Sequence, residues 1–119
     1  MDASDIAERL VAFCREGKYV DAIAELYAPN VRQFENGTEV PGGRDAIAEA
    51  CRGWVASRVI HQNAILGKHV SADAIVLEME YDVTPHDTKR RHQWREAGIY
   101  RVTDGKISDV RFYYQPPSP

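Results

Sequence analysis

The sequence predicts one α+β domain in which three helices, all in the first half of the chain, pack on a curved antiparallel sheet. Two observations lead to this fold class. Apolar residues recur at helical spacing in three segments before residue 58, and from residue 59 onward they alternate with polar residues at the period of a strand. A length of 119 residues suits a single domain with one core. Long strands folded against helices form a cone, which predicts a cavity at its open end.

The first two helices are expected at residues 4–16 and at about residues 20–27. Ser4 is a suitable N-cap for the first helix, and Gly17 is a suitable residue to end it. The second helix has apolar residues on one stripe, and the Pro29-Asn30 pair that follows is expected to stop it. Together the two segments predict a helical hairpin.

A short alternating segment, residues 31–35, predicts a strand before an Asn-Gly turn. A third helix is expected from about Arg44 to Ser57. The later strands, which carry the alternating pattern, are expected at residues 59–70, 74–83, 93–102 and 106–114. The domain therefore spans residues 1–115, and the proline-rich end, residues 116–119, is expected to be a disordered tail.

Composition excludes several classes of protein. The formal net charge is −3, which gives no indication of binding to nucleic acid or to an anionic membrane. No apolar run approaches the roughly 20 residues of a membrane-spanning helix, and the first residues lack the pattern of a signal peptide. A cytoplasmic location is expected, in which Cys14 and Cys51 stay reduced. No two histidines have zinc-ligand spacing, so neither a metal nor another cofactor is expected.

Three motifs carry a resemblance to a known family. A helix ends in Leu26-Tyr27-Ala28, the acidic Glu35 stands near the end of a short strand, and "GRDAI" at residues 43–47 opens the third helix. In this order they resemble the NTF2-like superfamily, which includes ketosteroid isomerases and SnoaL-like polyketide cyclases. The strands near the C-terminus look like those of SnoaL-like proteins, so the resemblance covers roughly residues 4–115. It implies the cone-shaped fold, called NTF2-like or cystatin-like, and a homodimer formed through the outer face of the sheet.

The resemblance also implies a role for Glu35, which stands where ketosteroid isomerases keep their acidic general base. An exposed strand-end glutamate is the alternative. The oxyanion donors of those isomerases do not carry over, because the tyrosine position of the first helix is Leu10 here and the position of the protonated aspartate is about Gly98. A steroid isomerase of that design is therefore not expected, and a SnoaL-like cyclase fits better.

Glu96 is the second candidate catalytic residue. Its strand has one face without arginines, which is assigned inward and carries Trp94, Glu96, Gly98, Tyr100 and Val102. A carboxyl group among aromatic side chains has a raised pKa, and with Glu35 it would form a coupled pair of one acid and one base. The alternative is that Glu96 pairs with an arginine or a backbone group and only shapes the cavity.

His61 is the third candidate, as a reserve acid or base. It is expected on the same side of its strand as Asn63 and Ile65. The alternative is a hydrogen-bonded structural histidine. The basic segment "HDTKRRH", residues 86–92, is expected to be a solvated hairpin loop, and its alternatives are a guard against cations or a site for an acidic ligand.

Six aromatic residues are candidates to line the cavity: Trp54, Tyr81, Trp94, Tyr100, Phe112 and Tyr114. They predict a small apolar or cyclic organic molecule as the ligand. If the protein is an enzyme, the expected chemistry is cofactor-free proton transfer on a carbonyl compound, as in isomerisation, cyclisation or dehydration. The alternative is a non-catalytic ligand-binding or dimerisation module of the same fold.

Overall fold

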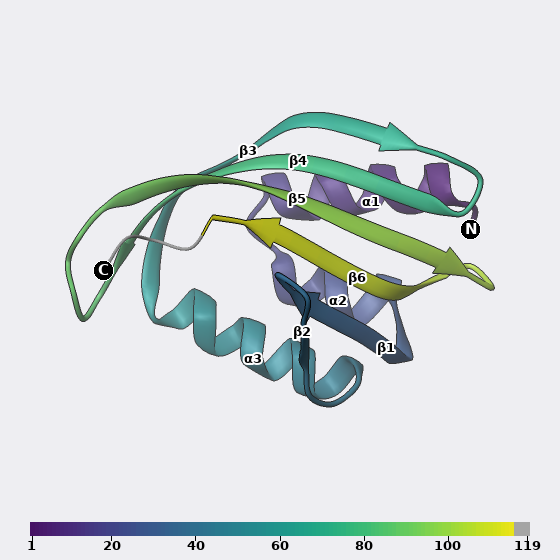
Figure 1. Cartoon of the computed structure of the whole chain (residues 1–119), viewed down its shortest axis with the longest axis horizontal. Coiled ribbons are helices and arrows are strands. Elements are labelled where there is room, and N and C mark those ends of the chain that lie inside the picture. The colour runs from purple at the N-terminus through teal and green to yellow at the C-terminus, as the bar shows by residue number, and fades with distance from the viewer. Residues whose placement is uncertain (116–119) are drawn as a thin grey trace.

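The computed structural model describes residues 1–115 as three helices on one face of a six-stranded, curved sheet (Figure 1). The helices are α1 (Ala3–Arg15), α2 (Tyr19–Leu26) and α3 (Arg44–Ala56). The strands are β1 (Tyr27–Glu35), β2 (Thr38–Val40), β3 (Arg58–Val70), β4 (Ala74–Pro85), β5 (His92–Thr103) and β6 (Lys106–Tyr114). The predicted tail, residues 116–119, lies outside the described residues. Within residues 1–115, no helix is long and apolar enough to cross a membrane.

The strands lie in the order β2-β1-β6-β5-β4-β3, and the sheet is mixed. Strand β1 runs parallel to β6, whereas every other neighbouring pair is antiparallel. The expectation of a wholly antiparallel sheet is therefore wrong at this one pair. Strands β1 and β6 are distant in the sequence, so no hairpin turn between them could have indicated their relative direction. The α+β class holds, and α3 enters the chain only after β1 and β2.

The end of α2 differs from its prediction. The helix stops at Leu26, and the next residue already belongs to β1. Pro29 and Asn30, which were expected to stop the helix, lie inside this strand. The β1–β6 register shifts between Tyr27 and Arg32, so the proline stands where the hydrogen-bond ladder is interrupted.

The start of α1 also differs, because Asp2 rather than Ser4 is its N-cap. The Asp2 side chain accepts a hydrogen bond of 2.8 Å from the backbone N–H of Asp5. Aspartate and serine cap helices about equally well, so local propensity could not separate two such neighbours.

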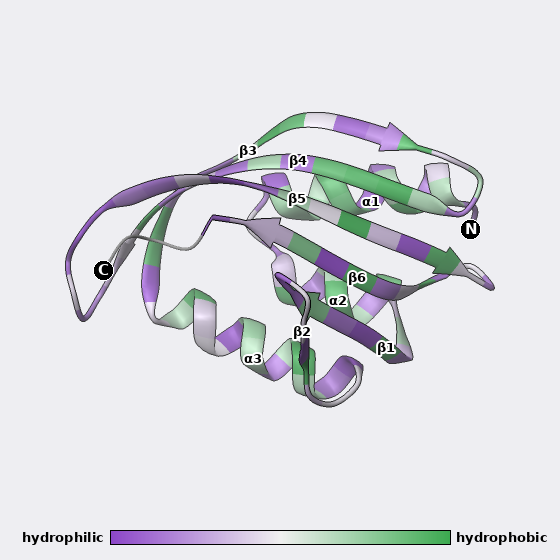
Figure 2. Ribbon diagram, in the orientation of Figure 1, coloured by the Kyte–Doolittle hydropathy of each residue, from purple (hydrophilic) through white to green (hydrophobic). Residues whose placement is uncertain are grey.

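The core lies between the helices and the concave face of the sheet. Strand β4 supplies its inner layer through alternate residues, and Figure 2 shows hydrophobic residues concentrated along this strand. Ile75 and Leu77 are fully buried there, and Ile6 and Leu10 of α1 are buried against the same core. Burying one such side chain stabilises the fold by roughly 1.5–3 kcal/mol.

Gly98 stands at a tight point of this inner face. A Cβ atom at this position would lie 2.9 Å from Cε2 of Tyr100 and 3.1 Å from Cε1 of Phe112. The two rings meet edge to face with their centroids 5.8 Å apart. Tyr100 is buried, so its ring cannot move aside without repacking of its neighbours.

We therefore expect Gly98→Ala to lower the free energy of unfolding by about 1–3 kcal/mol, measured by urea denaturation. Gly53→Ala is the matched control, because Gly53 lies in α3 and its Cβ would meet nothing within 4 Å. The control should raise the free energy of unfolding by about 0.5–1 kcal/mol. Equal stability of Gly98→Ala and the wild-type chain would contradict the packing described here.

Candidate functional site

A cavity of about 1400 Å³ lies between the concave face of the sheet and the helices. All three helices contribute to its lining, together with β1, β2, β4, β5, β6 and the β4–β5 hairpin. Strand β3 contributes only its first residue, Arg58. Ligand pockets are typically about 300–1000 Å³, so this space is large enough for a multi-ring organic molecule.

Both candidate carboxylates line this cavity. Glu35 ends β1 opposite Phe112 of β6, and Glu96 of β5 lies opposite Tyr114 of the same strand. Side chains of Phe112 and Tyr114 share the inner face, because they are two residues apart on one strand. The sheet register therefore places the two carboxylates on adjacent inward rows, on either side of β6.

Glu35 has one carboxylate oxygen without a partner. Oε1 accepts a hydrogen bond of 3.3 Å from Nε2 of Gln33, whereas Oε2 is buried and has no hydrogen-bond partner among the described residues. Burial raises the pKa of Glu35, and the side chains of Gln33 and Tyr114 act in the opposite direction. Buried polar atoms are nearly always hydrogen-bonded, so Oε2 is an acceptor that a ligand could use.

Glu96 is the carboxyl group that keeps its proton to the higher pH. Burial raises its pKa to about 7, and the nearby charge of Glu35 adds to the rise, while a hydrogen bond from Trp94 opposes it. That bond runs from Nε1 of Trp94 to Oε1 of Glu96 at 2.9 Å. Burial raises the pKa of Glu96 more than that of Glu35, so Glu35 is the member that ionises first and Glu96 retains its proton to near neutral pH.

The six aromatic residues predicted to line the cavity all do so. Four rings form a continuous series in the cavity wall. The ring of Trp54 meets Tyr81 edge to face at 5.8 Å, Tyr81 stacks on Trp94 at 5.1 Å, and His92 stacks on Trp94 at 4.9 Å. This series gives the cavity an aromatic wall beside Glu96.

His61 lies away from the two carboxylates. The β3–β4 pairing shifts its register between Ile60 and Gln62, so His61 is bulged and exposed, and its ring hydrogen-bonds to Oγ1 of Thr84 at 2.7 Å. The prediction that it shares a face with Asn63 and Ile65 is therefore wrong, because the extra residue of a bulge reverses the alternation. His61 does not line the large cavity.

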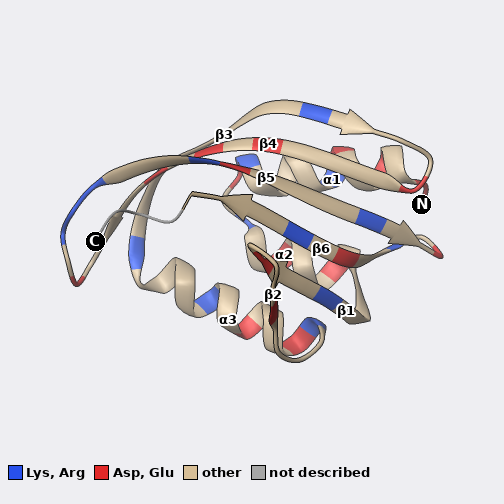
Figure 3. Cartoon of the chain, in the orientation of Figure 1, with Lys and Arg blue, Asp and Glu red and all other residues tan. Residues whose placement is uncertain are grey.

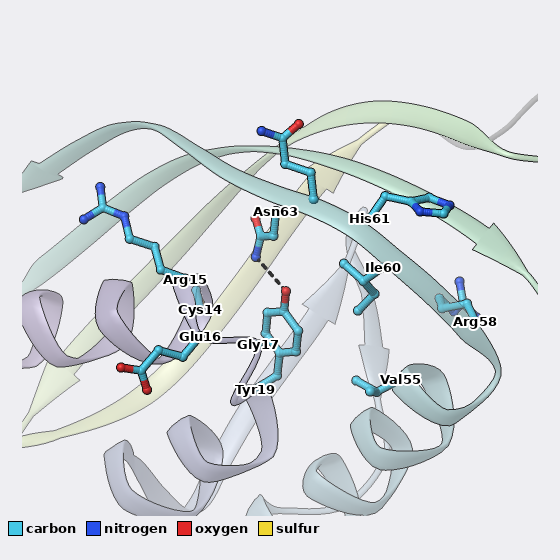
Figure 4. Close-up of a pocket in the computed structure, with 11 residues that line it drawn as sticks. Cys14, Arg15, Glu16, Gly17, Tyr19, Val55, Arg58, Ile60, His61 and Asn63 are labelled. Carbon is cyan, nitrogen blue, oxygen red and sulfur yellow. Dashed lines mark hydrogen bonds between the residues drawn. The ribbon is translucent and has the colours of Figure 1, made fainter.

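A smaller cavity of about 510 Å³ lies beside the turn between α1 and α2 (Figure 4). His61 and Asn63 both line it, but Figure 4 shows Asn63 pointing toward the helices and His61 away from them. Nδ2 of Asn63 donates a hydrogen bond of 3.2 Å to the hydroxyl of Tyr19, which lines both cavities. Tyr19 therefore borders both cavities.

Asn36 has a positioning role that the sequence did not reveal. Its side-chain N–H donates to the carbonyl oxygen of Tyr114 at 2.9 Å, and its Oδ1 accepts from the N–H of Tyr114 at 3.0 Å. Asn36 has a φ of 49°, which asparagine tolerates well. It extends the pairing of β1 with β6 beyond Glu35 and so holds Tyr114 beside the two carboxylates. The Asn-Gly pair in the sequence indicated only a turn.

Other lining residues were also missed. Tyr27 was expected at the end of a helix, but it starts β1 and lines the cavity. Arg58, at the start of β3, also lines the cavity, and so does Arg90 of the basic segment, for which a site for an acidic ligand was only an alternative. Cys14 and Cys51 are free thiols in the lining, and burial raises the pKa of Cys14 to about 12, so it is neutral at physiological pH. In the part of the chain that is described, no group of three potential ligands among His, Cys, Asp and Glu could hold a metal ion.

The sequence matches a known family model. The model of the SnoaL-like domain matches residues 7–110, which is most of the chain. No curated protein matches the sequence.

Solved structures with this arrangement are numerous. A candidate SnoaL-like polyketide cyclase from Mesorhizobium loti is 29% identical, with a TM-score of 0.86 over 96% of this chain and 100% of that one. An NTF2-like protein from Burkholderia thailandensis is 16% identical, with a TM-score of 0.80 over 97% and 92% of the two chains. A candidate isomerase from Rhodopseudomonas palustris is 16% identical, with a TM-score of 0.68 over 94% and 85%. The last two likenesses concern the fold alone.

The raised pKa of Glu96 predicts how stability depends on pH. Between its ordinary pKa of 4.5 and about 7, the folded protein holds a proton that the unfolded chain has lost. The free energy of unfolding should therefore fall as the pH rises through this window, by up to about 3 kcal/mol. Urea denaturation at a series of pH values should show this fall in the wild-type chain and a much smaller one in Glu96→Gln.

Glu80→Gln is the control for this series. Glu80 lies on β4 and pairs with Arg95 at 2.9 Å, outside the cavity lining. Its substitution should leave the pH dependence in this window as it is in the wild type. Identical slopes in Glu96→Gln and wild type would show that Glu96 does not hold the proton.

Proposed function

The chain belongs to the SnoaL-like domain family, and on that premise we propose that its cavity binds a small cyclic carbonyl compound on which Glu35 and Glu96 transfer protons without a cofactor. The observation that carries the proposal is the unpartnered Oε2 of Glu35. It is an available proton acceptor in the same cavity as a carboxyl group that stays protonated to near neutral pH. A matched base and acid in one sheltered cavity are what proton transfer next to a carbonyl group requires.

The proposed reaction begins at the carbon next to the carbonyl group. Glu35 removes a proton from this carbon, and the electron pair of the broken C–H bond moves toward the carbonyl oxygen. Glu96 donates its proton to that oxygen and so limits the build-up of negative charge. In each outcome the enol oxygen returns its proton to Glu96 as the carbonyl group re-forms. Transfer of the proton from Glu35 to a different carbon gives an isomer. Attack of the same carbon on a second carbonyl group, whose oxygen takes the proton from Glu35, closes a ring, and loss of a β-hydroxyl group as water, with the proton from Glu35, gives a dehydration.

The lining supports an apolar cyclic body for this ligand. Trp54, Tyr81 and Trp94 present a wall of stacked and edge-on rings beside Glu96. Flat apolar rings pack well on such a wall, and exclusion of water strengthens the interactions of the two carboxyl groups.

A non-catalytic ligand-binding module is the second candidate function. It is favoured by the lack of oxyanion donors at Leu10 and Gly98, because Leu10 is aliphatic and Gly98 has no room even for a Cβ atom. Two observations argue against a non-catalytic module. The cavity is large and open, and among the described residues Glu35 forms no ion pair. Catalysis is therefore the function that the site supports better.

We also propose that the protein is a homodimer formed through the outer face of the sheet. Tyr113 is 45% exposed on this face, opposite Ala97 and beside the partly exposed Ile99. Apolar side chains grouped on an exposed sheet face favour contact with a second copy. Analytical ultracentrifugation should give a dimer for the wild type and a monomer for Ile99→Asp, and a monomeric wild type would contradict this assignment.

We further propose a cytoplasmic location. The two free thiols, Cys14 and Cys51, suit a reducing compartment. Expression of a fluorescent fusion in the source cell and fractionation would test this assignment, and recovery from an extracytoplasmic fraction would contradict it.

Proton transfer can be tested with an uncharged cyclic ketone such as 2-tetralone, whose α-hydrogens exchange with deuterium in a way that NMR follows. The wild-type protein should accelerate this exchange, and Glu35→Gln should lower the protein-dependent rate by about 10²–10⁴-fold because the base is lost. The rate should fall as the pH rises above about 7, where Glu96 loses its proton.

Glu96→Gln should lower the rate and remove the decline at high pH, and Glu80→Gln should behave as the wild type. Circular dichroism would establish that each variant is folded. Exchange that is equally fast with wild type and Glu35→Gln would remove Glu35 from the mechanism, and no acceleration by the wild type would favour the binding module.

A further inference from the structure

One end of the cavity carries positive charge that has no ion-pair partner. Four arginines line the cavity, namely Arg58, Arg90, Arg91 and Arg95. Arg91 pairs with Asp82 at 2.7 Å, and Arg95 pairs with Glu80 at 2.9 Å. Within the described part of the chain, Arg58 and Arg90 have no carboxylate within ion-pair distance.

Arg58 is held in a fixed orientation in the cavity wall. Its guanidinium group stacks on the ring of Trp54 at 4.2 Å from the centroid. Nε donates to the carbonyl oxygen of Trp54 at 2.8 Å, and Nη2 donates to Oγ of Ser57 at 3.0 Å. The carbonyl at the end of α3 offsets only a fraction of a full charge, and burial lowers the pKa of this guanidinium without removing its charge. Arg58 is thus a partly buried cation without a full counter-charge.

Arg90 is an exposed residue of the β4–β5 hairpin and lines the same cavity. Arg58 pairs with Pro85 in the β3–β4 register, and the N–H of His86 donates to the carbonyl oxygen of Ser57 at 2.9 Å. The base of the hairpin is therefore joined to the start of β3, and Figure 3 shows the basic residues of both segments at one end of the molecule. Asp87 is the acidic lining residue at this end, and its charge acts on Arg58 from beyond ion-pair distance.

The aromatic wall separates this basic end from the two carboxyl groups. Along β4, Met79 is opposite Glu96 and Pro85 is opposite Arg58. These two points are about 20 Å apart along the strand, at the usual rise per residue. Tyr81 and the rings stacked with it lie between them. A ligand whose rings pack on this wall would extend from the carboxyl pair toward the arginines.

We propose that Arg58 and Arg90 form a subsite for a carboxylate group of the ligand, so that the substrate is a cyclic carbonyl compound that also carries an acid group. This inference rests on the proposed function for the position of the reacting carbonyl. Arginine is suited to the role, because its planar guanidinium donates two parallel hydrogen bonds to one carboxylate. Glu35, once ionised, would otherwise repel an anionic ligand, and the arginines fix the ligand's orientation with its acid group turned away from Glu35.

Binding of 2-naphthoate and of its uncharged analogue 2-naphthamide to the full chain, measured by isothermal titration calorimetry, tests the subsite. The wild type should bind 2-naphthoate about tenfold or more tightly than the amide. Arg90→Gln changes an exposed hairpin residue, so the variant should fold, and the loss of one cation should reduce this preference. The double variant Arg58→Gln/Arg90→Gln should abolish the preference. Arg101→Gln, at an exposed position outside the cavity lining, should keep it.

Equal affinity of the wild type for the two probes, or no measurable binding of 2-naphthoate, would overturn the subsite. A preference that survives in the folded double variant would do the same. Deuterium exchange of the uncharged 2-tetralone separates this inference from the proposed function. If the protein accelerates deuterium exchange but does not prefer 2-naphthoate to 2-naphthamide, only the subsite is overturned. If it prefers 2-naphthoate but does not accelerate the exchange, only the catalytic proposal is overturned.

Discussion

The account depends on two carboxyl groups that share one partly dehydrated cavity. The charge of Glu35 disfavours ionisation of Glu96, and burial disfavours the charged form of both groups. The consequence is a division of roles, in which Glu35 ionises first and Glu96 holds its proton to about pH 7. Trp94 and Gln33 each donate one hydrogen bond to this pair, which leaves Oε2 of Glu35 buried and unpaired.

The sheet is what brings these groups together. Strand β6 lies between β1 and β5, so residues about 60 positions apart in the sequence come to face one cavity. Asn36 extends the pairing of β1 with β6 and fixes Tyr114, and Gly98 leaves room for the rings of Tyr100 and Phe112. At the far end of the aromatic wall, Arg58 caps α3 and stacks on Trp54. The cavity is therefore acidic at one end, aromatic along its length and basic at the other end.

Much of this could be predicted from the sequence, because alternation with period two is a direct consequence of strand geometry. It predicted β4, β5 and β6 and the inward face of Glu96, and the family resemblance pointed to Glu35. The period-two pattern could not predict the bulge at His61, because one extra residue reverses the alternation and leaves no mark in the composition. The parallel pairing of β1 with β6 depends on packing between distant segments, and so does the position of Arg58. The catalytic roles of Glu35 and Glu96 remain predictions, whereas their shared cavity is a feature of the structure.

The most direct test of the central claim is an NMR titration of the side-chain carboxyl carbons of Glu35 and Glu96 in the folded protein. The account predicts a midpoint near 7 for Glu96 and a lower one for Glu35, with the Glu96 midpoint moving down in Glu35→Gln because a neighbouring negative charge is lost. Midpoints near the ordinary value of 4.5 for both groups, unchanged by the substitution, would show that the two carboxyl groups neither are dehydrated nor interact.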